Sequence, residues 1–281
     1  MNNVDSWNCS TCSTGVATNF CPRCGESRIK SSDLTLGPLL AQAGRSLTSL
    51  DGPLLRSLRT LVARPGSLTA AYLYGPRKPF IAPFQLFLIA NVIFFAVQSW
   101  ADIKIFSTPL ASHLHGQDWS ELAQRLVAAR LSVKGVTLAA FAPVFDQAAA
   151  VNAKSLVILM TIPFALLLIS LFARSGRPFV THMVFALHFY AFELLVLCAL
   201  LLITIADTWL GGPNPRSAIV DDVLFGVQLV AAAVYLYFAT ARVYAATGAS
   251  SIVKVAALVL AVGASVLAYR FSVFLITLSL A

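Results

Sequence analysis

The sequence predicts an α-helical integral membrane protein in which a five-span helical bundle follows a small cysteine-rich head. Three observations lead to this class. The 281 residues are 58% hydrophobic and only 11% charged, whereas a water-soluble domain carries about 25% charged residues. Five stretches are long and apolar enough, or nearly so, to cross a bilayer. Four cysteines near the N-terminus are paired in two CxxC motifs.

The paired cysteines predict a metal site. Cys9 and Cys12 form one pair and Cys21 and Cys24 form the other, with eight residues between the pairs. Two such pairs can surround one ion with four thiolates, which is the ligand set of structural Zn²⁺ sites. The alternative is four free or disulfide-bonded thiols. No apolar signal segment precedes the cysteines, which favours the reducing side of a membrane. We therefore expect a cytosolic zinc ribbon over residues 1–30 whose folding depends on the metal.

Residues 31–83 join this head to the membrane. We expect amphipathic helices as far as Ala63, because leucines recur on one helical face and Arg56 and Arg59 lie off it. Such a face can rest on the inner leaflet or on other protein. A collar follows, in which prolines and a glycine exclude a continuous helix and aromatic and basic side chains suit anionic headgroups at the cytoplasmic face. Its interface residues are Tyr72, Gly75, Arg77, Lys78, Phe80 and Pro83.

The transmembrane bundle is expected over residues 84–281. Residues 101–153, between the first two spans, should form an external amphipathic segment. Pro163 should kink the second span. The predicted spans are Phe84–Trp100, Leu156–Ala173, Val180–Ala206, Val223–Ala241 and Ile252–Ser279.

Lysines and arginines near the spans predict the orientation. The head and collar hold nine of them, and the loops after the second and fourth spans hold two each. The loop after the third span holds three aspartates against Arg216. This asymmetry places the N-terminus in the cytoplasm and the C-terminus outside, in agreement with reduced head cysteines.

Five polar residues within the spans are candidates for function, because burying such groups in lipid is costly. Each also has a structural interpretation as a packing or interface residue. His182 and His188 point about 120° apart on a helix, so they do not form a two-histidine metal site. We hypothesise that Glu193 pairs with Arg270. The five residues are Asn91, His182, His188, Glu193 and Arg270.

Several motifs together resemble a bacterial family of uncharacterised multi-pass membrane proteins with an N-terminal zinc ribbon. These motifs are the paired CxxC, Arg64-Pro65-Gly66, the collar pattern from Tyr72 to Pro83, and the stretch His182–Phe192. Glu26 departs from the family pattern, which has glutamine after the ribbon. The resemblance implies the bacterial inner membrane. It implies no activity and no catalytic residue, since the family is a domain of unknown function.

Two classes of function remain. In the first, the zinc ribbon binds a cytosolic protein partner or has a structural or regulatory role. In the second, the bundle transports a small solute, an ion or a lipid, with Asn91, His188 and Glu193 facing a cavity. A membrane-embedded enzyme ranks third, because the sequence holds no nucleophile elbow, P-loop or dinucleotide motif. The head lacks a basic stripe with interleaved aromatics, which disfavours nucleic-acid binding.

Overall fold

The computed structural model describes residues 6–28, 52–101, 105–210 and 218–281. Within these residues, five helical segments are long and apolar enough to cross a membrane. The chain is therefore a multi-pass membrane protein, and the predicted fold class is confirmed. The five segments are Pro83–Ala101, Leu138–Leu171, Phe179–Asp207, Val223–Tyr244 and Gly248–Leu280.

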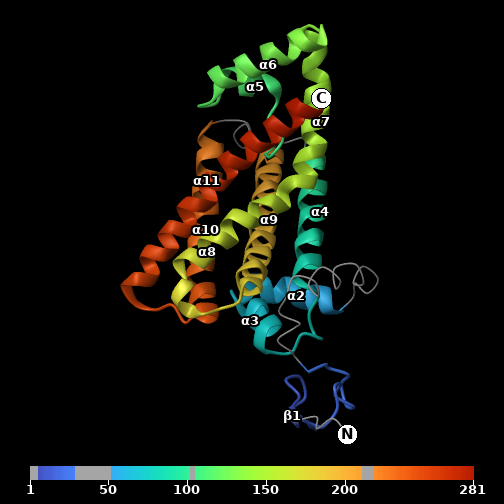
Figure 1. Ribbon diagram of the computed structural model, residues 1–281, viewed down its shortest axis with the longest axis vertical. Helices are drawn as coiled ribbons and strands as arrows, with labels where there is room; N and C mark the ends of the chain where they lie inside the picture. Colours follow the sequence, from blue (N-terminus) through green and yellow to red (C-terminus); the bar gives the residue numbers. More distant parts are fainter. Residues whose placement is uncertain (1–5, 29–51, 102–104, 211–217) are drawn as a thin grey trace.

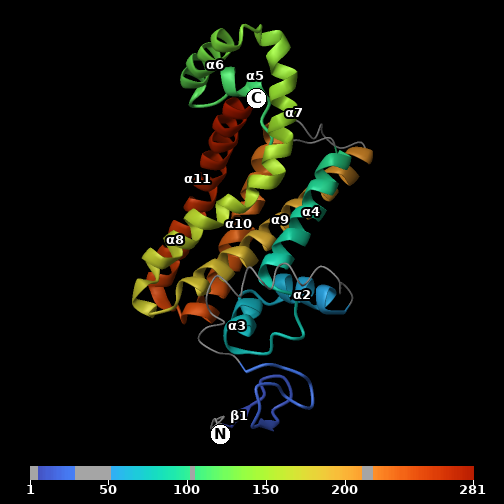
Figure 2. The same cartoon turned by 45° about the vertical axis from the view of Figure 1, so that its right-hand side comes forward.

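The cysteine-rich head, residues 6–28, is called the ribbon here. It and the C-terminal end of the last helix lie at opposite ends of the bundle (Figures 1 and 2). In the ribbon, the short strands β1 (Trp7–Asn8) and β2 (Gly15–Val16) pair antiparallel. At the other end, Trp100 and Trp209 meet edge to face with ring centroids 6.2 Å apart, and both side chains are exposed. Exposed tryptophans of this kind mark a membrane–water interface.

Two helices cross the base of the bundle next to the ribbon (Figure 1). They are α2 (Gly52–Ala63) and α3 (Ser67–Tyr74), and the first span, α4 (Pro83–Ala101), begins after the collar. The break between Tyr74 and Pro83 confirms that the collar interrupts the helix. On α2, Leu61 is buried, whereas Leu55 is exposed. The predicted apolar face thus packs on protein only in part. The rest of the predicted amphipathic region, residues 31–51, lies outside the described residues.

A cap covers the opposite end of the bundle. It contains α5 (Leu110–His115), α6 (Ser120–Lys134) and the start of α7 (Leu138–Leu156). These elements share a second apolar core with the end of the last helix, to which Phe145 and Phe274 contribute. Helix α6 lies within the segment expected to be amphipathic and external, and it buries Ala123 and Val127 in this core.

The second span is longer than the sequence suggested and begins at Leu138 rather than Leu156. It consists of α7, the 3₁₀ turn η2 (Val157–Met160) and α8 (Thr161–Leu171). Pro163 lies in the first turn of α8 and has no N–H to donate to a carbonyl in η2. The helix bends there, as Figures 1 and 2 show, so the predicted kink is present one turn before the proline. A second 3₁₀ turn, η3 (Ala173–Ser175), follows.

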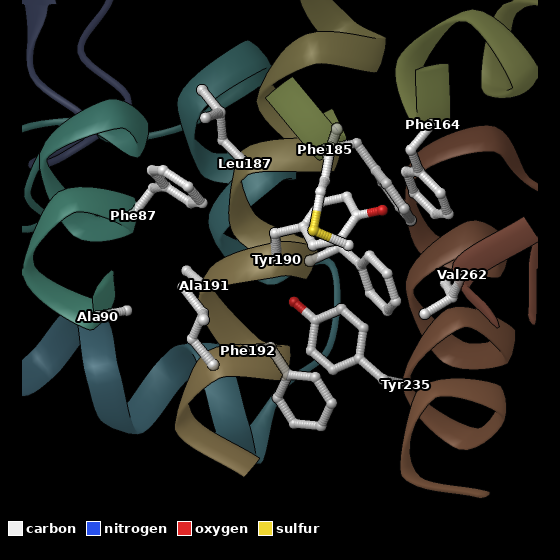
Figure 3. Packing of buried hydrophobic residues seen from close by; sticks show 14 of the residues in the cluster. Phe87, Ala90, Phe164, Phe185, Leu187, Tyr190, Ala191, Phe192, Tyr235 and Val262 are labelled. Atoms are coloured by element: carbon white, nitrogen blue, oxygen red, sulfur yellow. The ribbon is translucent and has the colours of Figure 1, made fainter. Parts of the chain in front are cut away.

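The remaining helices are α9 (Phe179–Trp209), α10 (Ala218–Tyr244) and α11 (Gly248–Leu280). Helix α9 is central and packs on α4, α8 and α10. Figure 3 shows Ala191 of α9 near Ala90 of α4, where small side chains permit close helix approach. On another side of α9, Phe192 stacks on Tyr235 of α10 with ring centroids 4.1 Å apart.

Candidate functional site

The four head cysteines come together as the sequence predicts. Their sulfur atoms all lie within 4.8 Å of one another. The Sγ atoms of Cys9 and Cys24 are 3.4 Å apart, as are those of Cys12 and Cys21. Cys9 and Cys21 are buried and the other two are half-buried. Four thiolates in this cluster can hold one metal ion, and an all-sulfur donor set fits Zn²⁺.

Each CxxC pair forms the same turn. In both, the amide of the first cysteine donates to the carbonyl five residues later, and the residue after the second cysteine donates back to the carbonyl of the first. These N···O distances lie between 2.7 and 2.9 Å. The residue after the second cysteine has a positive φ, 56° at Ser13 and 71° at Gly25. The cluster is therefore built from two equivalent knuckles.

The thiols of the cluster differ in acidity. Hydrogen bonds with the side chain and backbone of Thr14 lower the pKa of Cys12 to about 6. The pKa of Cys24 is raised to about 12: a backbone hydrogen bond from Glu26 lowers it, but burial and the three neighbouring thiols outweigh that bond. Close thiols resist ionising together, and a cation between them removes this conflict.

A buried carboxylate ties the second knuckle to the collar. Glu26 is only 4% exposed, and its Oε2 accepts from Thr11 Oγ1 at 2.7 Å and from the Lys78 backbone N–H at 3.3 Å. The Lys78 ammonium donates to the carbonyl of Cys24. A Cβ at Gly25 would lie 2.8 Å from Lys78 Nζ, so the ammonium rests directly on the knuckle. Glu26 and Lys78 thus join the ribbon to the collar.

The other collar residues form a bent connector. Arg77 Nε donates to the carbonyl of Tyr72 at 2.6 Å, and its guanidinium lies 4.6 Å from the Tyr72 ring centroid. Tyr72 is 6% exposed and packs in the core, and Phe80 packs against the same core. Gly75 ends α3 and Pro83 begins α4. Contact of Arg77 and Lys78 with anionic lipid stays a prediction.

The connection between α2 and α3 docks into the bundle. Gly66 has φ 76°, and a Cβ there would lie 2.9 Å from the Cα of Ala239 on α10. Arg242 donates to the carbonyl of Pro65 at 3.0 Å. Thr69 Oγ1 lies 2.9 Å from Nδ1 of His188 on α9. These contacts hold α2 and α3 against α9 and α10 at the end of the bundle next to the ribbon.

Both intramembrane histidines are buried against hydroxyl groups. His188 meets Thr69, and His182 Nδ1 lies 2.9 Å from the Tyr244 hydroxyl. The two imidazoles thus have separate partners on different elements. This arrangement suits histidines that act as hydrogen-bonded packing groups. The sequence allows that structural interpretation beside the functional one.

Glu193 and Arg270 have different partners, contrary to the hypothesis that they pair. Glu193 Oε2 accepts from the side-chain amide of Gln228 on α10, whereas Arg270 donates to the Ile105 carbonyl at 3.0 Å. Glu193 is 5% exposed. Its Oε1 and the Oε1 of Gln228 are buried without a hydrogen-bond partner. The fifth candidate, Asn91, is half-buried on α4.

Comparison with known proteins adds one short match. Residues 51–95 match the model of a family described as a protein of unknown function (DUF3667). The matched stretch covers α2 and α3 at the base of the bundle, the collar, and most of the first span, α4. No curated protein and no solved structure matches the chain.

Proposed function

We propose that this protein carries a zinc ribbon on the cytoplasmic side of a bacterial inner membrane. The ribbon binds a cytosolic protein partner, and the contact with Lys78 transmits the metal-bound or metal-free state of the ribbon to the bundle. Cys9, Cys12, Cys21 and Cys24 would hold one structural Zn²⁺. The observation that carries the proposal is the double contact of Lys78 with Cys24 and Glu26. Because the metal shapes the knuckle, loss of metal would release this contact.

The charge distribution supports a cytoplasmic ribbon. The turns between α8 and α9 and between α10 and α11 lie at the ribbon end of the bundle (Figure 2). Arg174, Arg177, Arg242 and Lys254 lie in or beside these turns. Together with the basic collar they give this end an excess of positive charge, which favours the cytoplasmic side.

The ribbon also presents an apolar side chain to solvent. Phe20 is 64% exposed, next to the metal-ligand Cys21, and its backbone forms a bridge with Ser27. The neighbouring Arg23 is exposed as well. Exposed aromatic and arginine side chains are enriched in protein–protein contacts, which supports a partner surface on this part of the ribbon.

Site-specific crosslinking in native membranes tests this function. A photo-reactive residue at Phe20 of the full chain should capture a discrete protein product, whereas one at the exposed Val133, at the other end of the bundle, should not. The product should be lost in Cys21→Ser. Equal capture from both positions, or capture that survives Cys21→Ser, would contradict a metal-dependent partner surface.

Transport through the bundle has less support. Glu193 is buried among aromatic side chains of α9 and α10, and its amide partner is also buried. A cavity lies at the start of α11, and neither Glu193 nor Gln228 is among its lining residues. A closely packed carboxylate favours the ribbon module over a solute path.

A further inference from the structure

A cavity of about 320 Å³ lies where α8, α10 and α11 meet at the ribbon end of the bundle. Its polar lining comes from the turn η3, the loop before α11 and the first turns of α11. Ligand pockets start at about this volume. The polar lining residues are Arg174, Ser175, Thr247, Ser250, Ser251 and Lys254.

The start of α11 supplies main-chain donors to this cavity. The first N–H groups of a helix have no partner within the helix and carry partial positive charge. Thr247 precedes the first helical residue, Gly248, and its side chain makes no capping hydrogen bond. Thr247, Ser250 and Ser251 line the cavity, so the start of α11 lies beside it. Binding an anion is a recurrent use of helix N-termini.

Ser251 independently indicates a ligand. Its side chain lines the cavity, is 2% exposed, and has an Oγ without a hydrogen-bond partner. A buried hydroxyl without a partner is costly. A ligand oxygen in the cavity would satisfy it.

The charged side chains select the sign of that ligand. Arg174 and Lys254 line the cavity, and none of the described lining residues is acidic. The Lys254 ammonium lies 4.7 Å from the Phe172 ring centroid, and Phe172 stacks on Tyr244 with centroids 4.2 Å apart. This aromatic pair fixes the position of the ammonium.

We infer that the cavity is a binding site for a phosphate group. A guanidinium, an ammonium, helix N–H groups and a hydroxyl together suit an oxyanion with several acceptor oxygens. The phosphate can belong to a lipid headgroup or to a soluble phosphate ester. Exposed Ile252 and Val253 on the same turn of α11 would place acyl chains beside the site in the first case. The inference does not depend on the zinc ribbon.

Two binding measurements on the full chain in dodecyl maltoside test this site. The first titrates inorganic phosphate. The second uses native mass spectrometry to compare phosphatidic acid with diacylglycerol of the same chains. Lys254→Gln and Ser251→Ala should each weaken phosphate binding about tenfold or more, which is the size of one hydrogen bond to a charged group. Lys254→Arg should retain binding, and Arg125→Gln, which removes an exposed charge on α6, is the matched control.

The stability of the phosphate-free protein separates a ligand role from a structural one. Ser251→Ala removes an unpaired buried hydroxyl, so it should leave the melting temperature unchanged or raise it while weakening binding. Binding in the lipid measurement alone assigns the site to a headgroup, and binding of inorganic phosphate alone assigns it to a soluble ester. The inference is overturned by binding in neither measurement, or by equal binding in Ser251→Ala, Lys254→Gln and Arg125→Gln.

Discussion

Gly66→Ala should be among the most destabilising single changes at the base of the bundle. The left-handed backbone of Gly66, with φ 76°, costs a residue with a Cβ about 1–2 kcal/mol. The new Cβ would also lie 2.9 Å from both Cα and O of Ala239. Backbone atoms cannot rotate away, so we add an overpacking cost of about 1–3 kcal/mol. The total loss should be about 2–5 kcal/mol.

Reversible unfolding in mixed detergent–SDS micelles measures this loss. Gly135→Ala is the matched control, because Gly135 has a similar φ of 66° but nothing within 4 Å of the added Cβ. Gly135→Ala should lower the free energy of unfolding by about 1–2 kcal/mol. If Gly66→Ala and Gly135→Ala are equally destabilising, the close contact between the α2–α3 connection and α10 contributes nothing, and the docking argument fails.

Three further predictions concern the metal, the buried carboxyl and the cap. Metal analysis should find one zinc per chain, lost in Cys21→Ser; full stoichiometry after loss of two cysteines would contradict the site. In double-mutant cycles of unfolding, alanine changes at Glu193 and Gln228 should couple by about 0.6 kcal/mol or more, whereas those at Glu193 and Arg270 should add within about 0.5 kcal/mol. Burial and the positive charge of Arg270 lower the pKa of His113 from 6.5 to about 4, although the negative charge of Asp146 acts in the opposite direction. Cap stability should therefore be full above about pH 6.5 and fall toward pH 4. The fluorescence of Trp119, whose indole N–H donates to His113, should report this loss. In His113→Gln the stability of the cap should no longer fall between about pH 6.5 and pH 4.

Local patterns predicted much of the ribbon and the bundle. The CxxC spacing predicts two short turns, and each of them is present with its own backbone hydrogen bonds. Four of the five spans were placed within a few residues, since an apolar run of membrane length has few alternatives. The predicted start of the second span was wrong. The polar residues of α7 led us to assign it to the external amphipathic segment, but Asp146 accepts from the Leu110 amide and Asn152 donates to Thr277.

The long-range polar contacts could not be predicted. Glu26 and Lys78 are 52 residues apart and meet only through the fold. The sequence predicts Arg270 as the partner of Glu193, whereas helix packing brings Gln228 to it. The pocket at Ser251 shows the same limit, because a serine in an apolar helix gives no sign of being unpartnered. Lys254 in the first two turns of α11 is the one sequence signal at that site, and only the fold brings Arg174 beside it.

The spans differ in length, and this difference has a mechanical consequence. At 1.5 Å per residue the 34-residue second span and the 33-residue α11 extend about 50 Å, whereas the 19-residue α4 extends about 28 Å. A hydrocarbon core is about 30 Å thick. The long helices can accommodate a thicker bilayer by reducing their tilt, but α4 has no length in reserve. Because α4 begins where the collar ends, membrane thickness should pull on Lys78 and, through it, on the ribbon.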